Sequence, residues 1–121
     1  MTFWGIRMKT VDKEITVEEL KKMSEKMFGR IVEAVVDIEK EIMVVDAMMH
    51  VDQEFVLLEN ESKQENLWGI NLKPLKFGSE DWIEFDSMIN LRPSQGNRSR
   101  RVDDPKIQEK IKKIVNRLVK E

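Results

Sequence analysis

The longest alternation of apolar and polar residues along the chain covers residues 82–92. Period two over eleven residues predicts a single β-strand with one buried face. The side expected to face the core holds Ile83, Phe85, Ser87, Ile89 and Leu91. The opposite side holds Trp82, Glu84, Asp86, Met88, Asn90 and Arg92.

Further strands are predicted at residues 31–38, 42–47 and 67–72. The first two are rich in Val and Ile and flank a short charged connection, which predicts a β-hairpin. With residues 39 and 40 in the turn, Asp37 pairs with Ile42. In this register the face opposite the apolar one carries the charged residues Glu33, Asp37 and Asp46.

The remaining apolar residues have helical spacing. Thr16, followed three residues later by Glu19, forms a capping box and starts a helix over 17–28. A shorter helix over 52–58, capped by Asp52, is the preferred interpretation of the segment after the hairpin. Asp104 and Pro105 start the last helix. Its apolar stripe consists of Ile107, Ile111, Ile114, Val115 and Leu118.

This order of elements predicts an α+β fold. We expect a two-layer sandwich, in which two amphipathic helices cover one face of an antiparallel sheet of about four strands. The other face is then solvated or meets a partner. The length suits a single domain over 1–121, with residues 1–15 as an N-terminal extension or edge strand.

The composition limits the class of protein. The chain has no Cys, which excludes disulfides and Cys-based zinc sites. No apolar run approaches the roughly 18 residues that a membrane helix needs, and the N-terminus lacks the apolar stretch of a secretory signal. We therefore expect a soluble cytoplasmic domain with no membrane contact and no bound cofactor.

Charge is distributed unevenly along the chain, although the net charge is only −2. Residues 33–91 carry 4 basic and 14 acidic groups, whereas residues 92–121 carry 10 basic and 4 acidic groups. Such segregation indicates either an internal match between the two parts or a basic surface for an anionic partner.

Four stretches of sequence resemble a known family. They are AVVD at residues 34–37, the spaced residues His50, Asp52 and Glu54, WGINL at 68–72, and EFDSMINLRPSQGNRSR at 84–100. Together they resemble a family of small uncharacterised bacterial and archaeal proteins, classed as a domain of unknown function. The resemblance covers nearly the whole chain after residue 15 and implies one intact small domain without implying an activity.

The arginine loop, residues 92–101, is the first candidate site. Its arginines alternate with Ser, Asn, Gln and Gly, which suits an anion cradle made of guanidinium forks and backbone N–H groups. The alternative is that these arginines pair with the chain's own carboxylates. The candidate ligand-binding residues are Asn90, Arg92, Asn97, Arg98, Arg100 and Arg101.

The uncovered face of the sheet is the second candidate site. Its carboxylates, with the only histidine nearby in sequence, could act as acid and base or bind a metal ion. The catalytic candidates are His50, Asp37 and Asp86. We expect no dedicated metal site from one His and no Cys. Asp37 and Asp46 each need a partner, for which a loop arginine is the obvious choice. An exposed Trp82 would indicate a binding surface.

Three functions remain open on the sequence alone. The preferred one is a non-enzymatic domain that binds an anionic ligand (nucleic acid, nucleotide or acidic protein segment) through the arginine loop. The second is a metal-assisted hydrolase or phosphoryl-transfer enzyme that uses the sheet-face carboxylates and His50. The third is a structural module that forms homo-oligomers through the open sheet face.

Overall fold

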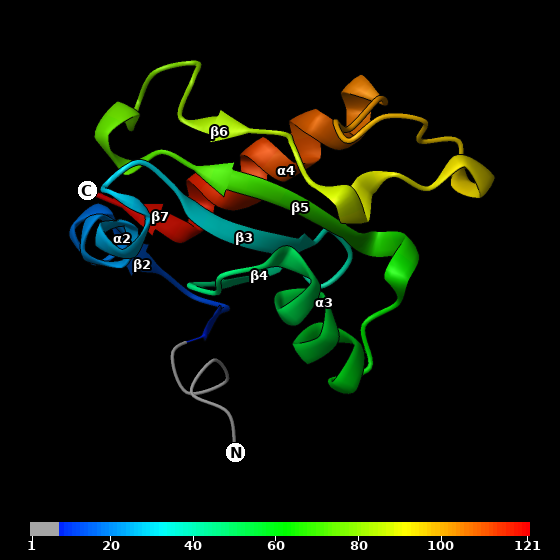
Figure 1. Ribbon diagram of the computed structural model, residues 1–121, viewed down its shortest axis with the longest axis horizontal. Coiled ribbons are helices and arrows are strands. Elements are labelled where there is room, and N and C mark those ends of the chain that lie inside the picture. Colours follow the sequence, from blue (N-terminus) through cyan, green and yellow to red (C-terminus); the bar gives the residue numbers. More distant parts are fainter. Residues whose placement is uncertain (1–7) are drawn as a thin grey trace.

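A computed structural model describes residues 8–121 and contains a five-stranded antiparallel sheet (Figure 1). The fold is α+β as expected, with one strand more than the four predicted. The strand order is β1-β4-β3-β5-β6. The strands are β1 (Lys9–Val11), β3 (Val32–Asp37), β4 (Ile42–Val45), β5 (Leu67–Leu72) and β6 (Ile83–Glu84). Of the predicted N-terminal extension or edge strand, residues 9–11 are an edge strand, and residues 1–7 lie outside the described part.

Two helices cover one face of the sheet, as predicted. They are α2 (Val17–Ser24), continued by the 3-10 turn η1 (Glu25–Met27), and α4 (Pro105–Leu118). Thr16 and Asp104 cap them through their side chains, which confirms both predicted starts. A short parallel pair, β2 (Ile15–Thr16) with β7 (Val119–Lys120), joins the beginning of α2 to the end of α4. The main core lies between these helices and the sheet.

The opposite face of the sheet was expected to be uncovered, but part of it is covered. Helix α3 (His50–Glu59) lies across part of it (Figure 1). Leu57 of α3 packs with Val35, Val44 and Leu67 in a second, smaller cluster. The predicted helix is therefore confirmed, but it begins at His50 after Met49, and Asp52 lies inside its first turn instead of capping it.

The β3–β4 hairpin has the predicted register, in which Asp37 pairs with Ile42. The prediction that a loop arginine is the partner of Asp37 is wrong. Its carboxylate is buried and accepts hydrogen bonds from the backbone N–H groups of Glu39 and Lys40 (2.9 and 3.0 Å) and from the Ser62 hydroxyl (2.6 Å). Asp37 thus stabilises the turn and has no arginine partner there. Asp46 pairs with Lys26.

The predicted long strand over 82–92 is wrong beyond its first residues. Only Ile83 and Glu84 pair with β5, and the chain then turns through η4 (Met88–Asn90). The side-chain amide of Asn90 takes the place of a paired strand beside Gly69. Its Oδ1 accepts a hydrogen bond from the Gly69 N–H (2.8 Å), and its Nδ2 donates one to the Gly69 carbonyl (3.0 Å). Trp82 is buried in the main core against Phe77 instead of lying exposed.

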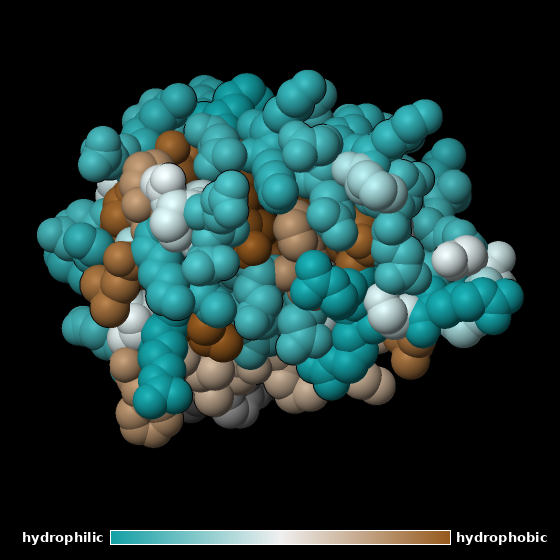
Figure 2. All heavy atoms as spheres, turned by 90° about the horizontal axis from the view of Figure 1, so that it is seen from above, coloured by the Kyte–Doolittle hydropathy of each residue, from teal (hydrophilic) through white to brown (hydrophobic). Residues whose placement is uncertain are grey.

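The remaining ordered turns are short 3-10 segments: η2 (Gln64–Asn66), η3 (Pro74–Lys76) and η5 (Pro93–Gln95). The side of the molecule that carries β6 is largely hydrophilic, with apolar atoms mainly in recesses and along one rim (Figure 2). Within residues 8–121, no helix has the length and apolar character needed to cross a membrane.

Candidate functional site: helix α3 and the seam beneath it

Helix α3 buries polar residues on its side toward the sheet and exposes large apolar residues on its outer side. Gln53 is fully buried and Glu54 nearly so, beside the buried Leu57. The outer side of α3 exposes Val51, Phe55 and Leu58, with 61% of Phe55 accessible to solvent. A surface helix of a monomer normally buries its apolar stripe and exposes its polar one. Both sides of α3 therefore call for an explanation beyond packing.

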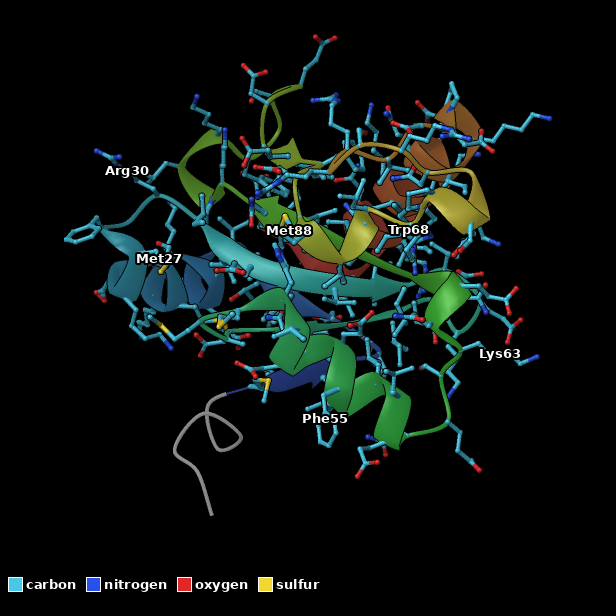
Figure 3. The ribbon with its side chains drawn as sticks, turned by 45° about the vertical axis from the view of Figure 1, so that its right-hand side comes forward. Met27, Arg30, Phe55, Lys63, Trp68 and Met88 are labelled. Carbon is cyan, nitrogen blue, oxygen red and sulfur yellow. The ribbon has the colours of Figure 1, made fainter. Side chains whose placement is uncertain are left out.

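The outer side of α3 exposes apolar side chains, and these, together with the exposed apolar residues of the flanking loop and of the segment around η4, are called the α3 surface. Figure 3 shows Phe55 pointing away from the sheet into solvent. η4 lies beside α3, where Ile89 packs on the cluster that holds Leu57. Most of the large exposed apolar residues of the described chain belong to this region. The α3 surface consists of Met48, Met49, Val51, Phe55, Leu58, Met88 and Leu91.

The inner side of α3 begins with a histidine–carboxylate pair. His50 Nδ1 lies 3.3 Å from Glu33 Oε1, and only 10% and 13% of the two side chains are exposed. His50 Nε2 lies 2.7 Å from the carbonyl oxygen of Ile70. A carbonyl only accepts hydrogen bonds, so Nε2 carries the proton. In neutral His50, Nδ1 is then an acceptor that faces Glu33.

Burial shifts both members of this pair toward their neutral forms. Desolvation raises the pKa of Glu33 to about 7; the His50 backbone N–H opposes this shift, and Asp52 adds to it. Desolvation likewise lowers the pKa of His50; the Ile70 carbonyl and Asp86 oppose that shift, and Arg100 adds to it. Around neutral pH, Glu33 is therefore partly protonated and is able to donate to His50 Nδ1.

Neighbouring strands extend this pair into a row of polar groups. Glu33 stands opposite Asn71, and Asn71 stands opposite Glu84, so all three share the face below α3. Asn71 Nδ2 donates to Glu84 Oε1 (2.9 Å) and to the Asp86 carbonyl (3.4 Å). We call Glu33, His50, Asn71, Glu84 and Asp86 the polar seam.

Two buried amide oxygens along the inner side of α3 lack a partner among the described residues. Asn71, only 8% exposed, has an unpartnered Oδ1. The fully buried Gln53 donates Nε2 to the Glu33 carbonyl (2.6 Å) but leaves Oε1 unpartnered. A buried polar atom left unsatisfied costs roughly 1–3 kcal/mol. The seam thus offers acceptors in excess of the chain's own donors.

The arginine loop is held largely by the chain itself. Arg92 donates to the carbonyls of Gln64 and Leu67 and stacks 4.3 Å above the Trp68 ring. Burial lowers the pKa of Arg92, and Glu54 opposes that shift. Arg100 donates to Asp86 (2.7 Å). Two of the four arginines proposed for a ligand therefore hold the loop against β5 and the polar seam.

Of the two asparagines proposed for ligand binding, Asn97 lies inside the arginine loop and Asn90 lies in η4, just before it. Asn97 Nδ2 donates to the carbonyls of Asn90, Ser99 and Arg101, and its Oδ1 accepts from the Asp103 N–H (2.8 Å). Asn90 is fully buried and also donates to the Arg100 carbonyl. These amides replace the regular backbone pairing that the segment lacks.

Arg101 is the loop arginine that borders a hollow. The hollow, of about 310 Å³, lies between β6 and α4 and is bordered by Lys73 and Lys112 as well as by Glu80, Asp81 and Glu84. Arg98 is exposed at the surface. Its backbone N–H donates to Asp103, whose pKa is held low mainly by the Ser99 hydroxyl and the Arg98 N–H.

The structure brings together two of the three proposed catalytic residues. His50 and Asp86 lie on the same face, close enough for Asp86 to affect the pKa of His50. Asp37 lies at the other end of β3, in the hairpin turn. Within residues 8–121, no three His, Cys, Asp or Glu side chains are arranged to hold a metal ion.

Comparison with known proteins places this architecture in a family. The family model described as "Protein of unknown function (DUF5674)" matches residues 9–118. The chain belongs to this family. Its resemblance to a domain of unknown function is thereby confirmed, and the family brings no activity with it. No curated protein and no solved structure matches the chain significantly.

Several residues of the site were not predicted from the sequence. Val51, Phe55 and Leu58 have the spacing i, i+4, i+7 of a helical stripe, which was the available signal. Such a stripe is normally assigned to the core. Asn71 and Gln53 gave no signal, because an amide becomes informative only when its burial and its partners are known.

Proposed function

We propose that this domain is an interaction module that docks a second copy of itself through the α3 surface. The exposure of Val51, Phe55 and Leu58 on one side of α3 is the observation that carries the proposal. The buried Leu57 holds α3 on the sheet, whereas the outer side of the helix leaves its apolar residues in water in the monomer. Covering the outer side of α3 removes Phe55, Val51 and Leu58 from water.

The size of the α3 surface fits a symmetric dimer. At about 170 Å² for each fully exposed large apolar side chain, its seven residues expose about 600 Å² of side-chain area. A single patch of that area is at the upper end of what monomers leave exposed. With a polar rim it approaches the roughly 800 Å² that each partner buries in a standard interface.

The sheet edges are weaker candidates for self-association. β1 is three residues long and carries Lys9 and Thr10 exposed on the edge. β6 is only two residues long. Short edges with a lysine are a common protection against edge-to-edge pairing. An isologous contact through α3 instead places Phe55, the middle residue of the stripe, near a two-fold axis.

Light scattering coupled to size exclusion tests the proposal on the full chain. We expect a mass near twice the 14.3 kDa of the chain at tens of micromolar. Phe55→Asp places a charge at the centre of the interface, so it is expected to weaken the dimer by about 2–4 kcal/mol and to give a monomer.

Phe28→Asp is the matched control, because Phe28 is 92% exposed at the end of the 3-10 turn after α2. It is expected to remain dimeric. A wild-type monomer throughout the concentration range contradicts the proposal, as does a Phe55→Asp protein that stays dimeric.

A second candidate function, anion binding by the arginine loop, is supported by the hollow at Arg101. Arg101, Lys73 and Lys112 border it, and Gln108 lies among them. The three acidic side chains of the same hollow favour a small anion over nucleic acid.

Titration with phosphate and with a nucleoside monophosphate tests this second candidate. Binding is expected to weaken with salt and to be lost in Arg101→Ala, while Arg117→Ala, on the last turn of α4, leaves it unchanged. Binding that survives Arg101→Ala, or no binding of either probe, refutes this candidate.

A further inference from the structure

The exposed methionines of the described chain all belong to the α3 surface. Met48, Met49 and Met88 expose 51%, 58% and 62% of their area. Met48 and Met49 directly precede α3, and Met88 lies in η4, which contacts α3 (Figure 3). Met43 of β4 is fully buried in the main core. The accessible thioether groups are therefore concentrated on the surface through which two copies dock under the proposed function.

Few other side chains of the described chain compete for a mild oxidant. The chain has no Cys, so no thiol is present. Trp68 and Trp82 are buried, with 2% and 4% of their area exposed. Oxidation of sulfur follows its exposure to solvent. A peroxide is therefore expected to react first with the methionines of the α3 surface.

Oxidation changes what a methionine contributes to an interface. The thioether is apolar, flexible and polarisable, and it packs well against other apolar side chains. The sulfoxide is polar, and burying it without a hydrogen-bond donor is unfavourable. The residues on the outer side of α3, Val51, Phe55 and Leu58, have no side-chain donor to offer. A sulfoxide on this surface therefore opposes docking.

We propose that a peroxide dissociates the α3-mediated dimer by oxidising Met48, Met49 and Met88 to methionine sulfoxide. The sulfur attacks one oxygen of hydrogen peroxide, an S–O bond forms as the O–O bond breaks, and the second oxygen takes up the proton of the first and leaves as water. Each sulfur is oxidised by two electrons, and one peroxide is reduced. This inference concerns the regulation of the α3 surface and rests on the proposed docking of two copies.

Treatment of the full chain with hydrogen peroxide tests the inference. Peptide mass spectrometry gives the oxidised fraction of each methionine, and light scattering coupled to size exclusion gives the mass of the particle. We expect the three exposed methionines to oxidise at least about tenfold faster than Met43. The mass is expected to fall from two copies to one as they react, with their sulfoxides enriched in the monomer fraction.

Two sets of substitutions separate oxidation of the α3 surface from other damage. The combined substitutions Met48→Leu, Met49→Leu and Met88→Leu keep apolar side chains of similar size, so this variant is expected to stay dimeric in peroxide. The matched control combines Met23→Leu and Met27→Leu, on α2 and η1. The control is expected to dissociate in peroxide as the wild type does.

The outcomes distinguish this inference from the docking on which it rests. A dimer that persists after complete oxidation of the three methionines overturns the inference and leaves docking through α3 intact. Equal sulfoxide content in the monomer and dimer fractions overturns it without any variant, and so does dissociation of the triple Leu variant in peroxide. A wild-type chain that is monomeric before oxidation removes both the docking and its regulation.

Discussion

Replacing Glu33 by Gln tests the protonation state of the polar seam. Gln has the shape of a protonated Glu and does not titrate. In the folded protein the pKa of Glu33 is raised from 4.5 to about 7, mainly by desolvation. The folded state therefore holds this proton more tightly than the unfolded chain, and the wild type loses stability as pH rises from about 4.5 to 7.

The size of the effect follows from that shift. At about 1.4 kcal/mol per pKa unit, a fully enclosed Glu33 would lower the free energy of unfolding by roughly 3 kcal/mol between pH 4.5 and pH 7. The side chains of Asp86 and Glu84 keep 45% and 40% of their area exposed, so water at that end of the seam screens the charge, and we expect about 1–2 kcal/mol. The other groups that act on Glu33, His50 and Asp52, are present in both proteins.

Urea unfolding followed by circular dichroism at pH 4.5 and pH 8 measures this difference. The two proteins are expected to have similar unfolding free energies at pH 4.5, and Glu33→Gln to be more stable at pH 8. Glu109→Gln, the same chemical change on an exposed helix face, should be neutral at both values. A difference that is equal at both pH values, or larger at pH 4.5, would contradict a raised pKa of Glu33 in the folded protein.

Two further predictions concern the scaffold that positions the seam. A Cβ on Gly69 would lie 2.5 Å from the Ser87 side chain, so Gly69→Ala is expected to lower the unfolding free energy by about 3 kcal/mol, and adding Ser87→Gly should restore part of it. Asp37→Ala removes three hydrogen bonds of a buried carboxylate and should cost about 2–3 kcal/mol, measured by urea unfolding. A loss below 0.5 kcal/mol in either single variant contradicts the structure.

The hairpin and the last helix were predictable, because the apolar pattern of each segment matches the face that the segment buries in the fold. Asp37 pairs with Ile42 as the alternation requires, since a slip by one residue would turn the apolar side chains away from the core. Asp104 and Pro105 fixed the start of α4, and its stripe is buried apart from the partly exposed Ile107.

The segment over 82–92 shows where alternation misleads. Its pattern matches a strand, yet the chain leaves the sheet after Glu84. Asn90 and Asn97 satisfy its backbone with side-chain amides, and hydrogen bonds of this kind compete with strand pairing. Single-sequence periodicity cannot detect such pairing, because the partners lie up to 21 residues away.

Helix α3 could be predicted as a helix but not oriented. Its segment contains both a polar set and an apolar set at helical spacing, and either could face the sheet. The choice depends on Glu33 and the Ile70 carbonyl, which bind His50 from two different strands. The position of the candidate site therefore follows from tertiary contacts.

Intermolecular NOEs detect docking of two copies through the α3 surface. A sample that mixes 13C-methyl-labelled protein with unlabelled protein reports only contacts between copies. Docking through the α3 surface predicts filtered NOEs from the methyl groups of Val51 and Leu58 to the ring protons of Phe55 in the other copy. Intermolecular NOEs confined to β1 or β6, or none at concentrations where a dimer is measured, would contradict it.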